Sequence, residues 1–92
     1  MTTTETSENR LKRMKMRAWH RGMKEMDLIL GPFADAHLAG LDTGTLDTLD
    51  ALMEENDQEI YTWFTGHTAP PARFAALVAT IGTFARNRIA AG

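Results

Sequence analysis

The 92-residue chain has no cysteine, so disulfide bonds and thiolate metal sites are excluded. No apolar run approaches the roughly 20 residues that cross a bilayer. The first ten residues, MTTTETSENR, have no apolar core of the kind found in signal peptides. These absences predict a soluble cytoplasmic protein. The length fits one domain, and we expect residues 1–8 to form a disordered tail and residues 9–90 to fold.

The usual groupings of catalytic and metal-binding residues are also missing. His20, His37 and His67 are far apart in the sequence and lack the spacing of metal ligands. The only serine, Ser7, lies beside the start of the first helix, where no base is placed to activate it. No glycine-rich phosphate loop is present. The sequence therefore predicts a protein that is not an enzyme and that binds no metal.

Apolar residues recur at helical rather than strand spacing throughout the chain. We expect a first helix from its cap at Ser7 to about His20, and a second from about Met23 to Leu38, kinked at Pro32. Three more helices should follow, starting at Asp42, at Asn56 and at the segment APPA, residues 69–72. The prediction is an all-α fold, a compact five-helix bundle in a single domain.

Charge is segregated along the chain, although the formal net charge is only −2. Seven basic residues and no acid lie between residues 10 and 24, whereas seven acids and no Lys or Arg lie between residues 42 and 59. Two interpretations remain open: the segments are neighbouring helix faces, or the basic face meets an anionic partner. Because the sequence pI of 5.8 is low for a nucleic-acid-binding domain, we expect no nucleic acid.

The segment RGMKE, residues 21–25, places a glycine inside an otherwise helix-forming basic run. In one interpretation Gly22 caps the second helix and Arg21 pairs with Glu25 one turn later, which contributes only about 0.2–0.5 kcal/mol. In the other, Gly22 lets a partner approach the backbone, flanked by a fixed cation and a fixed anion. The residues alone leave both interpretations open.

The stretch RAWHRGMKEMDLILGPFAD, residues 17–35, resembles the succinate dehydrogenase assembly factor family, the flavinylation factors of bacteria and mitochondria. The hallmark of that family is an Arg-Gly-x-x-Glu motif, matched here by Arg21, Gly22 and Glu25. A second segment, DQEIYTWFTG, resembles the family's Asp-x-x-Leu-Tyr-x-Trp-x-x-Gly pattern, with Ile60 as a departure. The resemblance covers about residues 10–88. The lack of a mitochondrial presequence indicates the bacterial branch.

The resemblance implies an assembly chaperone that binds the flavoprotein subunit of succinate dehydrogenase, and that of fumarate reductase as a further partner. It would promote covalent attachment of FAD to a histidine of that subunit. FAD would belong to the partner, so this chain would hold no tight cofactor, and we expect it to be a monomer.

A physical hypothesis for docking builds on the resemblance. Arg21, Gly22 and Glu25 would dock on the flavoprotein. Arg17, His20 and Lys24 would complement an acidic patch, and Asp27 would extend the contact. Trp19 is either a core residue or an interface anchor. The alternative function is an antitoxin-like or nucleic-acid-associated helical module that uses the basic first helix.

Overall fold

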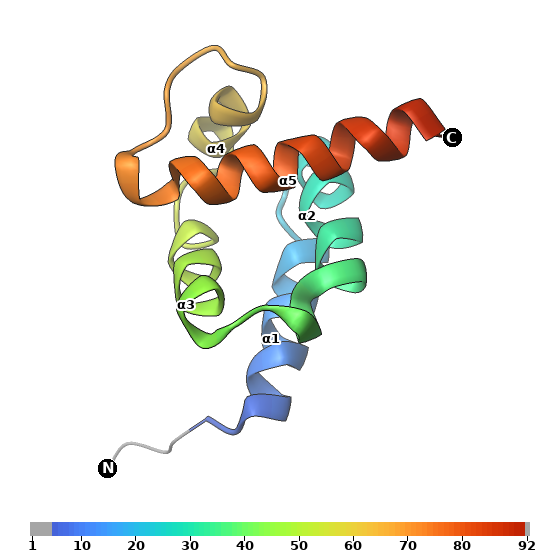
Figure 1. The fold of residues 1–92 in the computed structure, drawn as a ribbon, viewed down its shortest axis with the longest axis vertical. Helices are drawn as coiled ribbons and strands as arrows, with labels where there is room; N and C mark the ends of the chain where they lie inside the picture. The colour runs from blue at the N-terminus through green and yellow to red at the C-terminus, as the bar shows by residue number, and fades with distance from the viewer. Residues whose placement is uncertain (1–4, 92) are drawn as a thin grey trace.

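The computed structural model describes residues 5–91, which contain five α-helices and one short 3-10 helix joined by turns and loops (Figure 1). They are α1 (Ser7–Trp19), α2 (Lys24–His37), η1 (Leu38–Gly40), α3 (Thr43–Leu52), α4 (Asp57–Phe64) and α5 (Ala72–Ala91). Over this range the chain has no strand. The predicted all-α, five-helix fold is confirmed. Within the same range, no helix combines the length and hydrophobicity that a membrane crossing requires.

Helix starts follow the predicted capping residues, with one displacement. Thr6 rather than Ser7 caps α1, because its hydroxyl oxygen accepts a hydrogen bond of 3.1 Å from the amide of Asn9. Asn56 caps α4 as predicted, since its side-chain oxygen accepts a hydrogen bond of 2.8 Å from the Gln58 amide. Adjacent hydroxyl residues share the same capping chemistry, so the sequence did not distinguish Thr6 from Ser7.

The expected tail of residues 1–8 overlaps the first helix. Ser7 opens α1, so the boundary at residue 8 falls inside that helix. Glu5 accepts two hydrogen bonds from the Arg13 guanidinium, at 2.8 and 3.1 Å. Residues 1–4 lie outside the described part of the chain.

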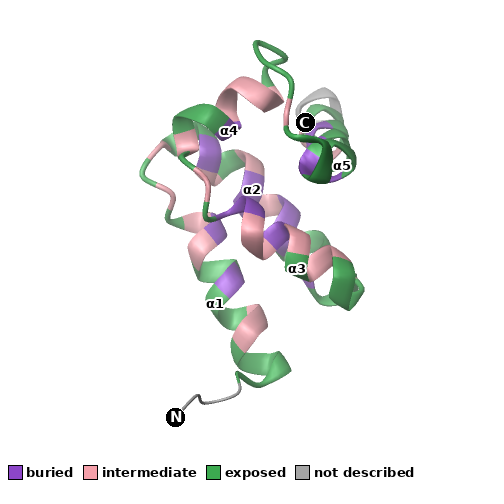
Figure 2. Ribbon diagram, turned by 90° about the vertical axis from the view of Figure 1, so that its left-hand side faces the viewer, coloured by how far each residue is buried: buried purple, intermediate pink, exposed green. Residues whose placement is uncertain are grey.

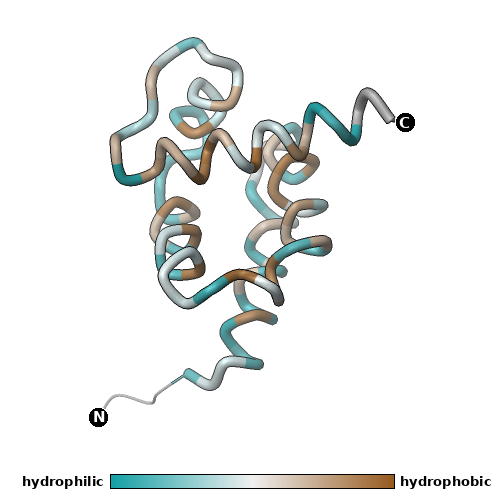
Figure 3. Tube along the Cα trace, in the orientation of Figure 1, coloured by the Kyte–Doolittle hydropathy of each residue, from teal (hydrophilic) through white to brown (hydrophobic). Residues whose placement is uncertain are grey.

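The hydrophobic core draws on all five helices. α5 runs across the molecule and contacts α2, α3 and α4, while α1 packs along α2 (Figure 1). The first two turns of α1 have no buried residue (Figure 2), and this helix is largely hydrophilic (Figure 3). The largest fully buried side chains come from all five helices and the α3–α4 turn: Met14, Met26, Leu30, Phe33, Leu52, Met53, Ile60, Phe74 and Ile81.

The contact between α1 and α2 depends on a small residue in α2. A Cβ atom added at Gly31 would lie 2.3 Å from Cδ2 of Trp19, so the indole ring lies directly on the glycine backbone. The Trp19 indole nitrogen also donates a hydrogen bond of 3.2 Å to Asp35 Oδ1. Trp19 is therefore a half-buried packing residue between the two helices. α2 continues through Pro32, which lies inside it.

Candidate partner-binding site

The α1–α2 turn, residues 20–23, carries the centre of the predicted site. Gly22 has a φ of +97°, a left-handed conformation that residues other than glycine rarely adopt. The backbone amide of Arg21 donates a hydrogen bond of 2.6 Å to Oδ1 of Asp27, in the early part of α2. The structure thus gives Asp27 a contact within the chain that fixes the path of the turn.

The side chain of Arg21 points into the protein. Its Nε donates a hydrogen bond of 2.8 Å to Oδ1 of Asp57, the first residue of α4, and Nη2 lies 2.8 Å from the same oxygen. Nη2 also lies 3.5 Å from the carbonyl oxygen of Glu55. The Arg21 side chain is only 5% exposed and that of Asp57 only 18%. The two form a mostly buried ion pair that joins the turn to the start of α4.

Arg21 and Glu25 do not form the ion pair across one helical turn that one interpretation of the segment RGMKE predicted, because Arg21 binds Asp57 instead. Glu25 is exposed in the first turn of α2, and no ion pair engages it within residues 5–88. Lys24 and His20 are exposed as well. The backbone of Gly22 and the side chains of His20, Lys24 and Glu25 therefore form the solvent-facing part of the site.

The three arginines of α1 face the acidic middle of the chain, in agreement with the interpretation that the two charged segments are neighbouring helix faces. Ion pairs connect α1 to the residues of α3 and of the turn that follows it: Arg10–Asp47 at 2.6 Å, Arg13–Asp50 at 2.7 Å and Arg17–Glu54 at 2.9 Å. Arg17, a predicted partner contact, is thus engaged by Glu54, although its side chain remains 40% exposed.

These ion pairs also determine how the groups titrate. Hydrogen bonds from Arg13 hold the pKa of Asp50 and the pKa of Glu5 below their ordinary values. Hydrogen bonds to Asp50 and Glu5 in turn raise the pKa of Arg13. Charge on α1 is therefore largely neutralised within the chain, which weakens the alternative function that uses α1 as a free basic surface.

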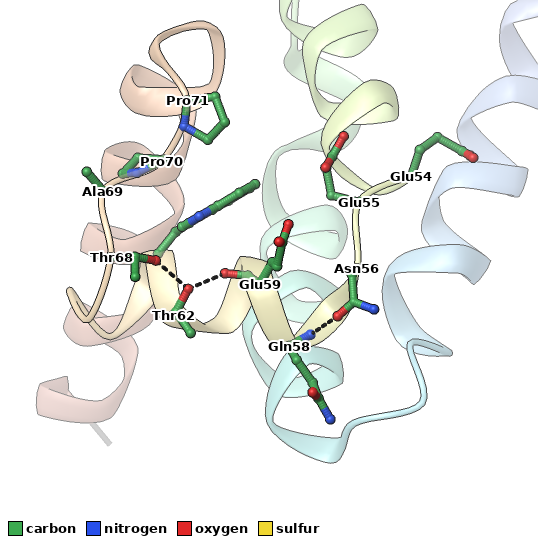
Figure 4. Close-up of a pocket in the computed structure, with 11 residues that line it drawn as sticks. Glu54, Glu55, Asn56, Gln58, Glu59, Thr62, Thr68, Ala69, Pro70 and Pro71 are labelled. Carbon is green, nitrogen blue, oxygen red and sulfur yellow. Dashed lines mark hydrogen bonds between the residues drawn. The ribbon is translucent and has the colours of Figure 1, made fainter.

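One shallow hollow adjoins the turn, and a second lies beside the first along α4. The first, of about 490 Å³, is lined by Arg17, His20, Arg21, Met53, Glu55, Asn56 and Asp57. The second, of about 990 Å³, shares Glu55 and Asn56 with the first and extends along α4 to Pro70 and Pro71 (Figure 4). Among the described residues, no group of three His, Asp or Glu is placed to hold a metal ion. Both hollows are open surface rather than cavities that enclose a small ligand, and only the first is lined by residues of the turn.

Asp57 is the site residue that reasoning from local pattern did not find. It lies 36 residues from Arg21, so neither helical spacing nor capping chemistry connects the two. The one available signal was that each lies in a segment that resembles the same family. The contact of Trp19 with Gly31 was missed for the same reason, because no spacing rule joins residues on different helices.

Comparison with known proteins identifies the family. Residues 12–85 match the family model described as "flavinator of succinate dehydrogenase". A "FAD assembly factor SdhE" from Colwellia psychrerythraea is 40% identical over 70 residues, which are 73% of this chain and 77% of that protein. A protein of the same name from Legionella pneumophila is 32% identical over 74 residues, 80% of this chain and 94% of its own length.

Mitochondrial relatives match as well. A "succinate dehydrogenase assembly factor 2, mitochondrial" from Mycosarcoma maydis is 33% identical over 87 residues, 95% of this chain. The aligned region spans 37% of that protein and 47% of a relative of the same name from Meyerozyma guilliermondii, less than half of either. Bacterial and mitochondrial assembly factors are thus both relatives of the chain. With the family model matched over residues 12–85, the chain belongs to the family of succinate dehydrogenase flavinators.

Proposed function

We propose that this chain binds the flavoprotein subunit of succinate dehydrogenase and promotes covalent attachment of FAD to it. The observation that carries the proposal is the family match over residues 12–85, with the Arg-Gly-x-x-Glu motif on an exposed, geometrically fixed turn. FAD belongs to the partner in this proposal, and the chain acts as an assembly chaperone without chemistry of its own.

The turn suits a docking role for three physical reasons. Gly22 has no side chain, so a partner can approach its backbone closely. Lys24 and Glu25 are adjacent exposed charges of opposite sign, which favours one orientation of the partner. The turn is held on both sides, by Asp27 and by Asp57, so little conformational freedom is lost on binding.

Binding would act by positioning. A chaperone that prefers the flavoprotein conformation in which histidine and flavin are aligned raises the population of that conformation. Bond formation then benefits from proximity and orientation. The same docking chemistry extends the proposal to the flavoprotein of fumarate reductase. The chain is proposed to act as a monomer, and no observation favours a nucleic-acid partner.

Glu25→Ala should weaken binding to the purified flavoprotein subunit by at least about tenfold, because an exposed charge at the centre of the docking surface is lost. Isothermal titration calorimetry measures the affinity. Thermal unfolding should change little, since Glu25 has no ion pair to lose within residues 5–88.

Glu59→Ala is a matched control. Glu59 is also an exposed glutamate in the first turn of a helix, α4, and its side chain has no ion pair within residues 5–88. It should bind as the wild type does. If the Glu25→Ala variant binds with the same affinity as the wild type and the Glu59→Ala variant, the α1–α2 turn is not part of the docking surface.

A further inference from the structure

We infer that Arg21 serves partner binding as a positioning residue that acts through Asp57, and that its guanidinium does not contact the partner. The inference rests on the proposed function, which makes the α1–α2 turn the docking surface. It gives Asp57 a role in partner binding. Within the Arg-Gly-x-x-Glu motif, Arg21 then holds the turn in shape, whereas Gly22 and Glu25 are exposed to the partner.

Burial argues against a direct contact by Arg21. A docking cation must offer its donors to the partner, but the Arg21 side chain is 5% exposed. Two of its nitrogens are already within 2.8 Å of Oδ1 of Asp57. A partner carboxylate would have to displace Asp57 and leave that carboxylate mostly buried without its cation, which is costly.

The contacts of Arg21 hold the turn from two directions. Its backbone amide donates to Asp27 on α2, at 2.6 Å, and its side chain binds Asp57 at the start of α4. Gly22 follows directly, and glycine loses more backbone freedom on ordering than any other residue. The two anchors on Arg21 therefore restrain the most flexible residue of the turn before a partner arrives.

Asp57 is well placed for this role. As the first residue of α4 it lies at the N-terminal end of that helix, where a negatively charged side chain stabilises the helix. Its Oδ2 is also the atom closest to a Cβ built on Gly22, at 4.0 Å. One carboxylate thus lies beside the glycine and binds the arginine that precedes it. Loss of this carboxylate should loosen the turn while the core, which is built from other residues, stays packed.

Asp57→Asn tests the inference, because asparagine keeps the shape of the side chain and removes its charge. Asp50→Asn is the control: it removes the carboxylate from another arginine ion pair, Arg13–Asp50, between α1 and α3. Calorimetric titration with the flavoprotein subunit gives the affinity. Amide hydrogen exchange of the free chain gives the order of residues 20–24.

We expect Asp57→Asn to weaken binding by about tenfold and to speed exchange in the turn, because a pre-organised surface is lost. Asp50→Asn should keep affinity within about twofold of wild type, with wild-type exchange in the turn. Arg21→Ala should weaken binding about as much as Asp57→Asn, and the double variant should lose no more than either single variant.

A charge exchange separates positioning from contact. Arg21→Asp combined with Asp57→Arg restores an ion pair in the reverse sense. Recovery of affinity supports positioning, because no cation then remains at residue 21. If the exchanged variant does not fold, the comparison of Arg21→Ala with Asp57→Asn still decides: a much larger loss for Arg21→Ala would show that Arg21 contacts the partner.

Failure of the inference and failure of the proposed function are distinguishable. If wild-type chain binds the flavoprotein and Asp57→Asn binds equally well, the positioning role is wrong and the proposed function stands. If wild-type chain shows no binding, the proposed function fails and this role fails with it.

Discussion

At the scale of the residue, Gly22 has a conformational reason to be glycine that is independent of any partner. Its φ of +97° lies in the left-handed region, where a Cβ atom is strained. The space around it is open, since the nearest atom to a built Cβ, apart from those of residues 21–23, is 4.0 Å away. The interpretation of Gly22 as the cap of the second helix is wrong, because Met23 is the N-cap of α2. The turn geometry requires a glycine at residue 22, and its backbone faces solvent, as the close approach of a partner would need.

Gly22→Ala should lower the free energy of unfolding by about 1–2 kcal/mol, through backbone strain alone. Urea denaturation followed by circular dichroism measures it. Gly40→Ala is the control, because Gly40 has no positive φ and no atom within 4 Å of a built Cβ. A Gly22→Ala protein as stable as Gly40→Ala would contradict the strained turn. Affinities of Gly22 variants for the flavoprotein are therefore compared only at temperatures where each variant is fully folded.

The sequence predicted the exposure of two residues of the Arg-Gly-x-x-Glu motif but not the burial of the third. Gly22 and Glu25 were expected at an exposed site, and both are exposed. Arg21 was expected to dock beside them, yet its side chain is buried against Asp57. The sequence did not reveal this, because arginine at a helix end is ordinarily exposed and its partner lies 36 residues away.

At the scale of the element, helix positions were predictable because their signals are local. Apolar spacing and capping residues lie within a few positions of each helix end, so Asn56 marked the start of α4 correctly. The packing of Trp19 on Gly31 was not predictable, since it depends on how two helices cross. The segregated charges allowed two interpretations, neighbouring helix faces or a basic face that meets an anionic partner. The ion pairs between α1 and α3 favour the first.

The ion pairs between α1 and α3 predict how stability depends on pH. The pKa of Asp50 is held below its ordinary value of 3.8 by Arg13, so the folded state favours the ionised carboxylate. That contribution is fully present above the unfolded-state pKa, and it is lost as pH falls through the lower folded-state pKa.

Asp50→Asn should therefore be less stable than wild type by a constant amount between about pH 5 and pH 7, and the difference should shrink below about pH 4. Urea denaturation at a series of pH values measures the difference. A gap that stays constant down to about pH 2, or widens there, would contradict the assigned role of Asp50.

At the scale of the whole molecule, the chain pairs most charges of α1 internally and leaves the α1–α2 turn exposed to solvent. The core draws on all five helices, which gives the turn a rigid support. The fold class and the family followed from the sequence, because they rest on local patterns and on a resemblance over most of the chain, whereas the place of the docking site stays a prediction. The contact of Arg21 with Asp57 needed three-dimensional placement, since it joins distant segments of the chain.

The central claim is that the chain promotes covalent FAD attachment, and one measurement tests it most directly. Flavin fluorescence of the flavoprotein subunit, separated in a denaturing gel, reports only covalent flavin. Cells lacking the gene should show a weak band. Wild type and Glu59→Ala should restore the band, and Glu25→Ala should restore little of it. A band of full strength without the gene, or full restoration by Glu25→Ala, would contradict the account.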